Sequence, residues 1–361
     1  MDDSNRAIQF DEHGQCSCCR DALIRLPNEW WPNAEGERRL EQLVKRLRAG
    51  GRGRPYDAII GLSGGVDSAY LAHVLKHKYD LRLLAVHVDG GWNSDQAVRN
   101  IETIVRTLNL DLFTYVVEWQ QMREVQVAFL KASVLNQDIP QDHAFFSVLY
   151  QTAGKFGVKY FLSGVNFATE SIIPPESGHP YMDVRHIRGV HRQFGKGILE
   201  SFPLMDLSYF VWLSRVRKQL LVFRPLNYLP YNKEIAAEEL KKHYDWRDYG
   251  TKHHESRFTK FYQQIYLPRK VFFDKRRLHL SSLIVSQAMT REQALQELAK
   301  PIIDEKEAAR DVKFVAKKLG CAHEDLNVWI NRRVIPHRDY PNRYWLHATL
   351  TWMRDQIRRF E

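Results

Sequence analysis

The sequence lacks the features that would place a protein in or beyond a membrane. Its most apolar stretch, residues 207–223 (LSYFVWLSRVRKQLLVF), carries Arg215, Arg217 and Lys218 in its middle, whereas a membrane span needs about 20 largely apolar residues. No N-terminal segment combines a basic head with an apolar stretch, so no secretory signal is predicted. These absences predict a cytoplasmic protein without a membrane span.

Cysteine is scarce, with four residues in a chain of 361. Three of them lie in the segment 16–19 (CSCC), and the fourth is Cys321. In a cytosolic chain this grouping favours metal or thiol chemistry over disulfides. Cys16 and Cys19 have the C-x-x-C spacing of two corners of a tetrahedral zinc site, with Cys18 as a substitute. Because zinc needs four ligands, this is half a site, and Cys321 is predicted to pack in a helical tail.

Acidic residues are outnumbered, since 53 Lys and Arg face 43 Asp and Glu and give a net charge of +10. Such a charge suits nucleic acid, an anionic membrane surface or anionic small substrates. The basic residues are spread widely apart from a denser run at 268–277 (PRKVFFDKRR), and most are interpreted as solvated. Charge alone therefore selects no partner. Hydrophobic content of 44% fits a globular chain that buries a core.

Short apolar runs alternate with helical patterns over the first part of the chain. Strands are predicted at 56–63, 81–89, 112–117, 159–165 and near 220–226, and helices at 68–78, from Ser94, at 122–133 and at 142–156. Asn93 or Ser94 caps the second of these helices. The alternation predicts an α/β fold, a Rossmann-like parallel sheet with helices on both faces and strands buried between them. Ligands of such sheets bind beyond the carboxyl ends of the strands.

Three regions are predicted: an N-terminal arm with the cysteine cluster (1–50), the α/β domain (51–230) and a helical C-terminal region (231–361). The last includes a helix at 232–243 and a capping-box pattern at 290–293, with Pro301 ending that helix. A polar, proline-containing stretch from 168 to about 202 is long for a connection. It is predicted to be a functional loop or lid.

The segment 63–68 (SGGVDS) follows the first predicted strand and precedes a helix. Two glycines let the backbone turn sharply and approach an anion closely, and the N–H groups at a helix start favour negative charge. A plain strand-to-helix turn is the alternative, but the full string in this context favours an anion site. The lysine that phosphate-binding loops present to the β- and γ-phosphates is missing.

SGGVDS resembles the pyrophosphate loop of the PP-loop ATP pyrophosphatases. Nearly the whole chain resembles the N-acetyl sugar amidotransferase family, through the blocks AVHVDGGWNSDQAVRNIETIV, SGVNFATESIIP, LPYNKEIA, WRDYGTKHHESRFTKFYQQIYLPRK and DKRRLHLSSLIVS. The resemblance implies an ATP-dependent enzyme of bacterial surface polysaccharide (LPS O-antigen) biosynthesis. It would convert an acetamido group of a nucleotide-linked sugar to an acetamidino group through an adenylated imidate, releasing AMP and pyrophosphate.

The resemblance also implies roles for individual residues. The loop would hold the departing pyrophosphate of ATP, and Asp67 would help to hold Mg²⁺. The residues predicted to bind ATP or pyrophosphate are Ser63, Gly64, Gly65, Val66, Asp67, Ser68, His87, Asp89, Ser163 and Gly164. Of these, Asp67, Ser63 and Ser68 are the predicted catalytic residues. His87 lies within an apolar strand, so a core histidine is the alternative for it.

Substrate contacts are predicted from the ends of the later strands and from the C-terminal blocks. These residues are Trp92, Asn93, Asp142, His143, Asn166, Thr169, Glu170, Lys252 and Arg257. Loop hydrogen bonding is the alternative for the group at 166–170, and a helix cap is the alternative for Asp142. Lys252 and Arg257 suit phosphate or uronate, or equally an outward salt-bridge cluster.

No glutaminase domain is recognised, since the chain begins Met1-Asp2-Asp3 and has no cysteine between Cys19 and Cys321. The resemblance implies a separate glutaminase with a cyclase-like companion, which would supply ammonia, and no nucleic-acid partner. Family members carry another C-x-x-C upstream, so Met1 is interpreted as an internal methionine and the arm, without a complete zinc site, as loose. The alternatives are a PP-loop tRNA-modifying enzyme, of the thiolase or lysidine synthetase type, and a non-catalytic nucleotide-binding subunit.

Overall fold

The fold is built on a parallel β-sheet. The computed structural model describes the chain except for residues 3–7, 175–178, 213–219, 250–254, 347 and 350–361. Within the described chain the sheet has five strands in the order β3-β2-β1-β4-β5, and every neighbouring pair is parallel. The strands are β1 (Ala58–Gly61), β2 (Leu83–Asp89), β3 (Asp111–Val116), β4 (Tyr160–Leu162) and β5 (Leu221–Phe223). The predicted α/β fold with a parallel sheet is confirmed.

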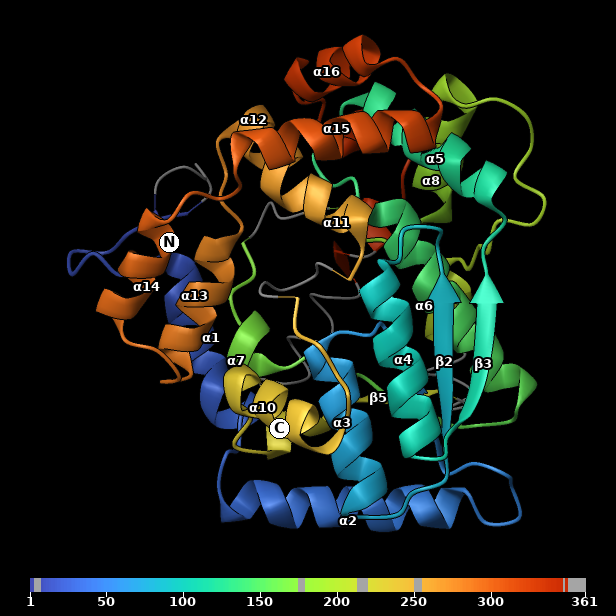
Figure 1. The fold of residues 1–361 in the computed structure, drawn as a ribbon, viewed down its shortest axis with the longest axis vertical. Helices are drawn as coiled ribbons and strands as arrows, with labels where there is room; N and C mark the ends of the chain where they lie inside the picture. Colours follow the sequence, from blue (N-terminus) through green and yellow to red (C-terminus); the bar gives the residue numbers. More distant parts are fainter. Residues whose placement is uncertain (3–7, 175–178, 213–219, 250–254, 347, 350–361) are drawn as a thin grey trace.

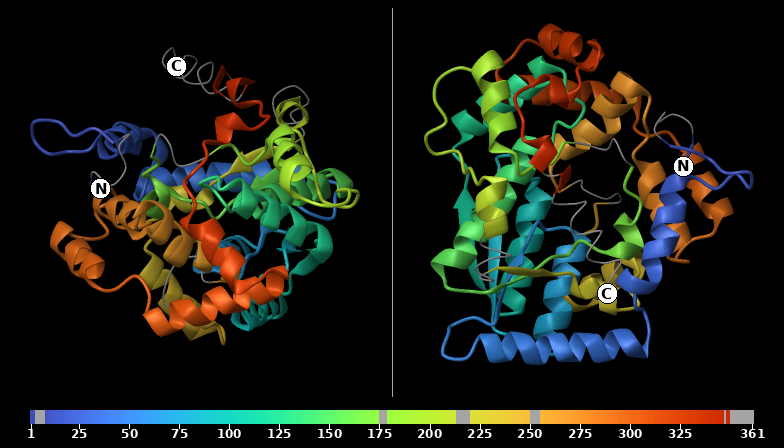
Figure 2. Two further views of the ribbon diagram at one scale, coloured as in Figure 1. Left: turned by 90° about the horizontal axis from the view of Figure 1, so that it is seen from above. Right: turned by 180° about the vertical axis from the view of Figure 1, so that it is seen from behind.

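Helices surround this sheet and make up the C-terminal region (Figures 1 and 2). Those before β5 are α1 (Ser17–Glu29), α2 (Ala34–Gly50), α3 (Val66–His77), α4 (Asp95–Thr107), α5 (Trp119–Ala132), α6 (Ile139–Lys155), α7 (Phe167–Glu170), α8 (Val184–Phe194) and α9 (Leu207–Val211). Those after it are α10 (Lys233–His243), α11 (Arg257–Phe261), α12 (Leu267–Val271), α13 (Arg276–Val285), α14 (Arg291–Ala299), α15 (Glu305–Leu319) and α16 (His323–Asn331). A 3₁₀ turn at Pro225–Tyr228, a π-helical turn at Tyr262–Tyr266 and a 3₁₀ turn at His337–Asp339 complete the elements.

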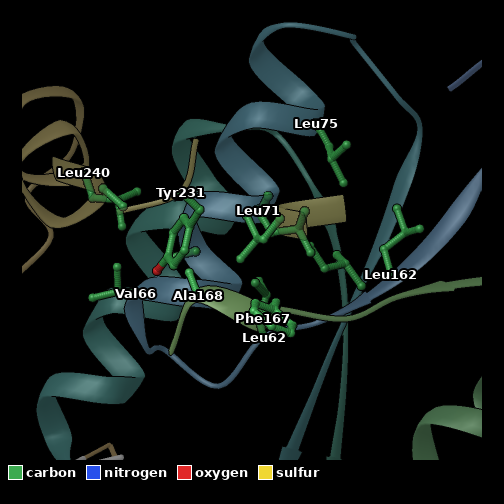
Figure 3. Close-up of a cluster of buried hydrophobic side chains, with 14 of the residues drawn as sticks. Leu62, Val66, Leu71, Leu75, Leu162, Phe167, Ala168, Tyr231 and Leu240 are labelled. Atoms are coloured by element: carbon green, nitrogen blue, oxygen red, sulfur yellow. The ribbon is translucent and has the colours of Figure 1, made fainter. Parts of the chain in front are cut away.

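Alternating side chains of the central strands build two separate cores. Ile60 of β1 packs in a core with helices α2, α3, α4 and α10, whereas its neighbour Ile59 packs in a second core with α5, α6 and α8. This is the two-residue period of a strand that is covered on both faces. Figure 3 shows part of the first core, where the Tyr231 ring lies beside Leu71 of α3.

The strand at one edge departs from the predicted burial. β3 pairs with β2 alone among the described strands, and its residues alternate between exposed and half-buried. Val116, for example, is 68% exposed. The prediction that all the strands are buried on both sides is therefore wrong for β3, because an edge strand has a sheet neighbour on one side only.

The stretch predicted to be a loop or lid contains helices instead. Residues 168–202 include most of α7 and all of α8, and α8 packs against α5. Val184, Ile187 and Val190 of α8 are buried. Their spacing is that of one face of a helix, but the polar, proline-containing residues before α8 hide this pattern in the sequence. Residues 175–178 lie outside the described chain.

The predicted caps of α4 and α14 agree with the structure, whereas α3, α5 and α6 begin two or three residues before their predicted starts. The Ser94 hydroxyl accepts the Ala97 N–H at 3.1 Å and caps α4, and Thr290 and Gln293 form the capping box of α14. The helical C-terminal region has a third core, formed by α11, α15 and α16 together with Trp92.

The three-region division stays a prediction, and the first core crosses both of its boundaries. Leu40 of α2 and Leu240 of α10 belong to the same cluster as the sheet residue Ile60. In Figure 1, β2 and β3 point toward the side that carries α5 and α15, and α2 crosses the opposite end. Within the described chain, no helix is both long and apolar enough to span a bilayer.

Candidate active site

The SGGVDS segment forms the turn from β1 into α3. Gly64 has φ +85°, and a Cβ there would lie 2.7 Å from the Ala97 carbonyl oxygen, so only glycine fits. The Ser63 hydroxyl accepts the Gly65 N–H at 3.2 Å and lies 3.3 Å from the Ser68 hydroxyl, which donates to the Gly65 carbonyl. The turn therefore presents the start of a 12-residue helix, whose N–H groups and dipole suit an anion.

A second turn packs directly on the first. Ser163 and Gly164 follow β4, the strand next to β1, and a Cβ on Gly164 would lie 3.1 Å from the Ser68 backbone nitrogen. From β1 the chain continues to β2 and β3 on one side of the sheet and then crosses to β4 and β5 on the other side. The direction in which strands are added therefore reverses between β1 and β4. Parallel sheets bind ligands at such a switch point.

A buried hydroxyl fixes the carboxylate of Asp67, which lies in the first turn of α3. Tyr231, 3% exposed, donates its phenolic hydrogen to Oδ1 of Asp67. Burial and the charges of Asp67 and Glu170 raise the pKa of Tyr231, so its hydroxyl keeps the proton that it donates. Tyr231 was not singled out from the sequence, although it lies in the block LPYNKEIA.

The C-terminal region is attached to the turn after β2. Asn93 and Ser256 form an isolated antiparallel bridge, the Ser94 N–H donates to the Glu255 carbonyl at 2.9 Å, and the Arg257 N–H donates to the Trp92 carbonyl at 2.9 Å. Nearby, the Tyr249 hydroxyl donates to the Gly64 carbonyl at 3.0 Å. These bonds bring segments far apart in the sequence to one edge of the sheet.

A cavity of about 380 Å³ lies at this edge. Predicted site residues that line it are Ser63, Gly65, Val66, Asp67, Ser68, His87, Asn93, Asp142, Ser163, Gly164 and Glu170. Glu255 and Ser256, which belong to a block that carries the resemblance, also line it. Lining residues that the sequence did not single out include Asp138, Phe145, Phe146, Lys233, Asp248, Tyr249, Thr259, Gln263 and Lys275. The structure thus brings together the loop, the ends of β2 and β4, the start of α6 and the beginning of the C-terminal helices.

His87 is both a core residue and a lining residue. It is 8% exposed, and its Nδ1 lies 2.9 Å from the Leu62 carbonyl oxygen while its Nε2 lies 2.9 Å from Nδ2 of Asn93. A carbonyl can only accept, so Nδ1 carries the hydrogen and Nε2 accepts from the Asn93 amide. The histidine thereby fixes the orientation of Asn93 at the cavity.

Two aspartates at the start of α6 face the cavity. Asp138 is the N-cap residue of α6, and Asp142 lies in the first turn of the helix. The alternative that Asp142 is the helix cap is therefore wrong. Burial raises the pKa of Asp138 to about 6, against the favourable charge of Lys275. Burial, with the negative charge of Asp138 beside it, raises the pKa of Asp142 to about 8. A carboxyl group that titrates near neutral pH is the kind of group that moves protons in enzymes.

The charge of the described lining is acidic. Its carboxyl side chains are Asp67, Asp138, Asp142, Glu170, Asp248 and Glu255, and its lysines are Lys233 and Lys275. The described lining of the cavity therefore does not share the net positive charge of the whole chain. An anion bound at this cavity would therefore depend on the backbone N–H groups of the loop more than on the two lysines of the described lining.

The remaining predicted site residues lie outside the lining. Asp89 accepts the Gly91 N–H at 2.7 Å, and the 1%-exposed Trp92 donates to Gln126. The ring of His143 is held between the Tyr181 carbonyl and the Met205 N–H. Asn166 caps α7 through the N–H and hydroxyl of Thr169, and Gly64 shapes the loop. Lys252 lies outside the described residues.

Arg257 takes the outward salt-bridge arrangement. Its guanidinium lies 3.4 Å from the carboxylate of Asp311 and over the ring of Phe314. Lys260, one turn later, pairs with the same aspartate at 2.7 Å. Arg257 therefore joins α11 to α15 in the third core region rather than lining the cavity.

The cysteine cluster lies at the start of α1, and the partial zinc site at Cys16 and Cys19 stays a prediction. Cys16 is the N-cap residue of α1, and its Sγ accepts the Cys19 N–H at 3.2 Å. Burial raises the pKa of Cys18, and burial together with Cys16 raises that of Cys19 to about 12, so both side chains are thiols when no metal is bound. No group of three or more Cys, His, Asp or Glu side chains in the described chain is arranged to hold a metal ion.

A magnesium ion places different demands on the protein. Mg²⁺ is commonly held by one or two carboxylates together with substrate phosphates and water. Asp67, fixed by Tyr231 at the start of α3, and Glu170, which lines the same cavity, have oxygen ligands of that kind. The residues present therefore fit a magnesium ion that arrives with a nucleotide.

A family model matches the C-terminal part of the chain. Residues 255–353 are similar to the family described as LPS biosynthesis protein WbpG-like, C-terminal domain. The match begins at Glu255, so Glu255, Ser256, Thr259, Gln263 and Lys275 of the cavity lining lie within this WbpG-like segment. No curated protein sequence matches the chain.

Several solved structures resemble parts of the chain. The NH3-dependent NAD synthetase from Campylobacter jejuni has 18% identity over 37% of this chain and 58% of its own, with a TM-score of 0.29. The NMN synthetase from Francisella tularensis has 22% identity over 50% and 70%, with a TM-score of 0.28. The U34-tRNA thiolase NcsA from Methanococcus maripaludis has 13% identity over 73% and 79%, with a TM-score of 0.34. The chain spans less than two thirds of the NAD synthetase, and likenesses at these scores fix neither function nor ligand.

Proposed function

We propose that the protein is an ATP-dependent amidotransferase of LPS O-antigen biosynthesis. It converts an acetamido group of a nucleotide-linked sugar to an acetamidino group and releases AMP and pyrophosphate. The observation that carries the proposal is one cavity lined both by the SGGVDS turn and by the start of the WbpG-like segment, where a Cβ on Gly65 would lie 3.0 Å from the Glu255 carboxylate. A turn that suits phosphate and a segment similar to LPS biosynthesis proteins thus line the same cavity.

The turn suits cleavage between the α- and β-phosphates. The N-terminus of α3 offers backbone N–H groups, and Ser63 and Ser68 offer hydroxyls, without a lysine in the turn to hold a γ-phosphate. Such fixed donors stabilise the charge that develops on a departing pyrophosphate. Asp67 and Glu170 would hold Mg²⁺, which supplies additional charge stabilisation when it is bound.

Activation of the amide explains why ATP is needed. An amide oxygen is a poor leaving group, so its attack on the α-phosphorus, with loss of pyrophosphate, converts it to an adenylated imidate. Ammonia then replaces AMP at the carbon. The enzyme must mainly hold the acetamido oxygen in line with the phosphorus, and such positioning lowers the barrier strongly.

The lining residues from α6 and the WbpG-like segment suit a sugar. Carboxylate and hydroxyl oxygens accept hydrogen bonds from sugar hydroxyl groups, and Glu255 and Ser256 offer such acceptors. Phe145 and Phe146 supply apolar surface to the same lining. Small-molecule sites commonly combine apolar and aromatic walls with a few polar groups that fix orientation.

Ammonia is proposed to come from a separate glutaminase with a cyclase-like companion. The purified chain should then use ammonium but not glutamine, and glutamine-dependent turnover by the chain alone would refute the partnership. Amidine formation is read as the small mass decrease from an amide to an amidine. The assay presents ATP, Mg²⁺ and ammonium with a panel of acetamido sugar nucleotides, including a diacetamido uronic acid.

A matched variant separates catalysis from folding. Asp67→Asn keeps the size of the side chain and a partner for Tyr231 but removes the charge. It should abolish AMP formation while the circular dichroism spectrum is unchanged. Turnover near the wild-type rate in Asp67→Asn would count against the assignment of the loop.

The alternative is a tRNA-modifying enzyme of the PP-loop type. A thiolase would need a cysteine at the site, yet all four cysteines are in the described chain and none lines the cavity. Tight tRNA binding that weakens steeply with salt would favour the alternative. The non-catalytic binding subunit is tested by the same AMP assay.

A further inference from the structure

We propose that Asp142 is the base that accepts a proton from the nitrogen nucleophile. The inference rests on the proposed function and adds a catalytic residue for its second half, the replacement of AMP by ammonia. Asp142 lines the same cavity as Ser63 and Asp67 but lies on a different element, the first turn of α6.

The placement of Asp142 sets it apart from the groups that handle phosphate. The SGGVDS turn and Gly164 form one wall, whereas Asp142 lies with Asp138, Phe145 and Phe146 on the wall formed by α6. A carboxylate repels phosphate oxygens, so this wall suits the part of the reaction in which nitrogen carries positive charge. Ammonia becomes cationic as it forms the C–N bond, and a nearby carboxylate stabilises that charge.

The surroundings of Asp138 hold the start of α6 against the WbpG-like segment. Its Oδ1 accepts from the Thr259 hydroxyl at 3.3 Å and from Nε2 of Gln141 at 3.4 Å. The Gln141 side chain in turn accepts from the Ser256 hydroxyl at 3.5 Å. Asp138 is thus a positioning residue with partners of its own, and Asp142, one turn later, is the carboxyl group left to act on a ligand.

The charged and titratable groups that face Asp142 come from several elements. Asp138 repels its charge, and Lys275, which precedes α13, attracts it. The charge of Asp142 also acts on the half-buried Tyr181 and the buried Tyr262, and the pKa values of both tyrosines are raised. Burial and Asp138 outweigh Lys275 and keep the pKa of Asp142 at about 8. A base with such a pKa accepts a proton from an alkylammonium-like nitrogen more readily than an ordinary carboxylate does.

The second half of the reaction begins with the attack of ammonia. The lone pair of ammonia forms a bond to the carbon of the adenylated imidate, whose own nitrogen keeps its hydrogen. One proton passes from the new nitrogen to the carboxylate of Asp142. The C–O bond then breaks, both electrons leave with AMP, and the product is a cationic acetamidinium group. Asp142 later gives its proton to water.

The test separates the two halves of the reaction. Exchange of labelled pyrophosphate into ATP, with the acetamido sugar nucleotide present and ammonium absent, measures adenylation alone. Ammonium-dependent formation of the acetamidino product measures both halves. Asp142→Asn should retain exchange but lose amidine formation by about 10²–10⁴-fold, the usual effect of a general base. Asp142→Glu should recover part of that loss, and the exposed Asp95→Asn in the first turn of α4 is the matched control.

The pH profile is a readout that a structural role would not change. Measured at a constant concentration of free ammonia, wild-type amidine formation should rise with pH as Asp142 loses its proton, whereas exchange should not follow that rise. Asp142→Asn should lack it.

Each other outcome has a defined meaning. Amidine formation by Asp142→Asn within about tenfold of wild type would overturn the role of Asp142. Equal loss of exchange and amidine formation would overturn it too, because the residue would then act on the first half. If the wild-type protein shows neither activity with any sugar of the panel, the proposed function fails, and the role of Asp142 fails with it.

Discussion

Replacing Tyr231 by phenylalanine tests how the nucleotide site is organised. The change removes one oxygen, the donor to Oδ1 of Asp67, and leaves a ring that packs in the first core beside Leu71. Because Tyr231 is 3% exposed and fixed by its neighbours, water does not easily replace the lost hydroxyl. Asp67 then loses the contact that holds its carboxylate at the start of α3.

The expected size of the effect follows from the kind of bond. A hydrogen bond to a charged group contributes about 1.5–3 kcal/mol, and about 1.4 kcal/mol corresponds to a factor of ten. Tyr231→Phe should therefore lower kcat/KM for ATP by about 10–100-fold. The dependence on Mg²⁺ should shift to higher concentration, since a mobile carboxylate holds the ion less well.

The assay is AMP release over a titration of Mg²⁺, and isothermal titration of the protein with MgATP gives a second readout. Tyr70→Phe is the control, because the ring of Tyr70 lies 5.7 Å from that of Tyr231 and its hydroxyl is hydrogen-bonded to Glu239. If Tyr231→Phe and Tyr70→Phe have the same kcat/KM and the same Mg²⁺ dependence, the Tyr231–Asp67 contact does not organise the site.

Three further predictions concern the loop and the stability of the fold. Gly64→Ala should abolish AMP formation, because its Cβ would lie 2.7 Å from a backbone carbonyl oxygen. Gly53→Ala is the control: Gly53 also has a positive φ, +70°, but open space around it, so the change should lower the free energy of unfolding by only about 1–2 kcal/mol. Similar losses of activity in both variants would refute the steric argument. Asn100→Ala should lower the free energy of unfolding, measured in urea, by about 3 kcal/mol, because the fully buried side-chain amide donates hydrogen bonds to the loop and to residues 247–249. A decrease below about 1 kcal/mol would contradict this. Burial lowers the pKa of His143 to about 4, so stability present above the unfolded pKa of about 6.5 should fall by about 2 kcal/mol on acidification from pH 6.5 to 5. His143→Gln should show a shallower loss over this range, and an equal slope would refute the assignment.

The sheet could be predicted from the sequence because its central strands are short, apolar and punctuated by glycine or a capping residue. β1 and β2 are buried on both faces, which produces the continuous apolar runs that were used to find them. β3 was placed correctly, but its exposure follows from the strand order, which no local pattern encodes. α8 was missed because the polar and proline-containing segment before it dominated the pattern.

The site was only partly predictable for a similar reason. The turn residues Ser63 and Asp67 are neighbours in sequence, so their relation is visible in a motif. Tyr231 reaches Asp67 through the tertiary fold, across a sequence separation of 164. Glu255 reaches the cavity lining in the same way. His143, in contrast, stands next to Asp142 in sequence but points into the protein, because successive residues of a helix face different directions.

The most direct test of the account is to identify the products of ATP. Wild-type protein is incubated with ATP, Mg²⁺, ammonium and an acetamido sugar nucleotide, and nucleotides and sugars are quantified together by chromatography and mass spectrometry. The account predicts AMP and pyrophosphate in equal amounts with an acetamidino sugar, and none of the three without the sugar. Formation of ADP and phosphate, or consumption of ATP with an unchanged sugar across the whole panel, would contradict it.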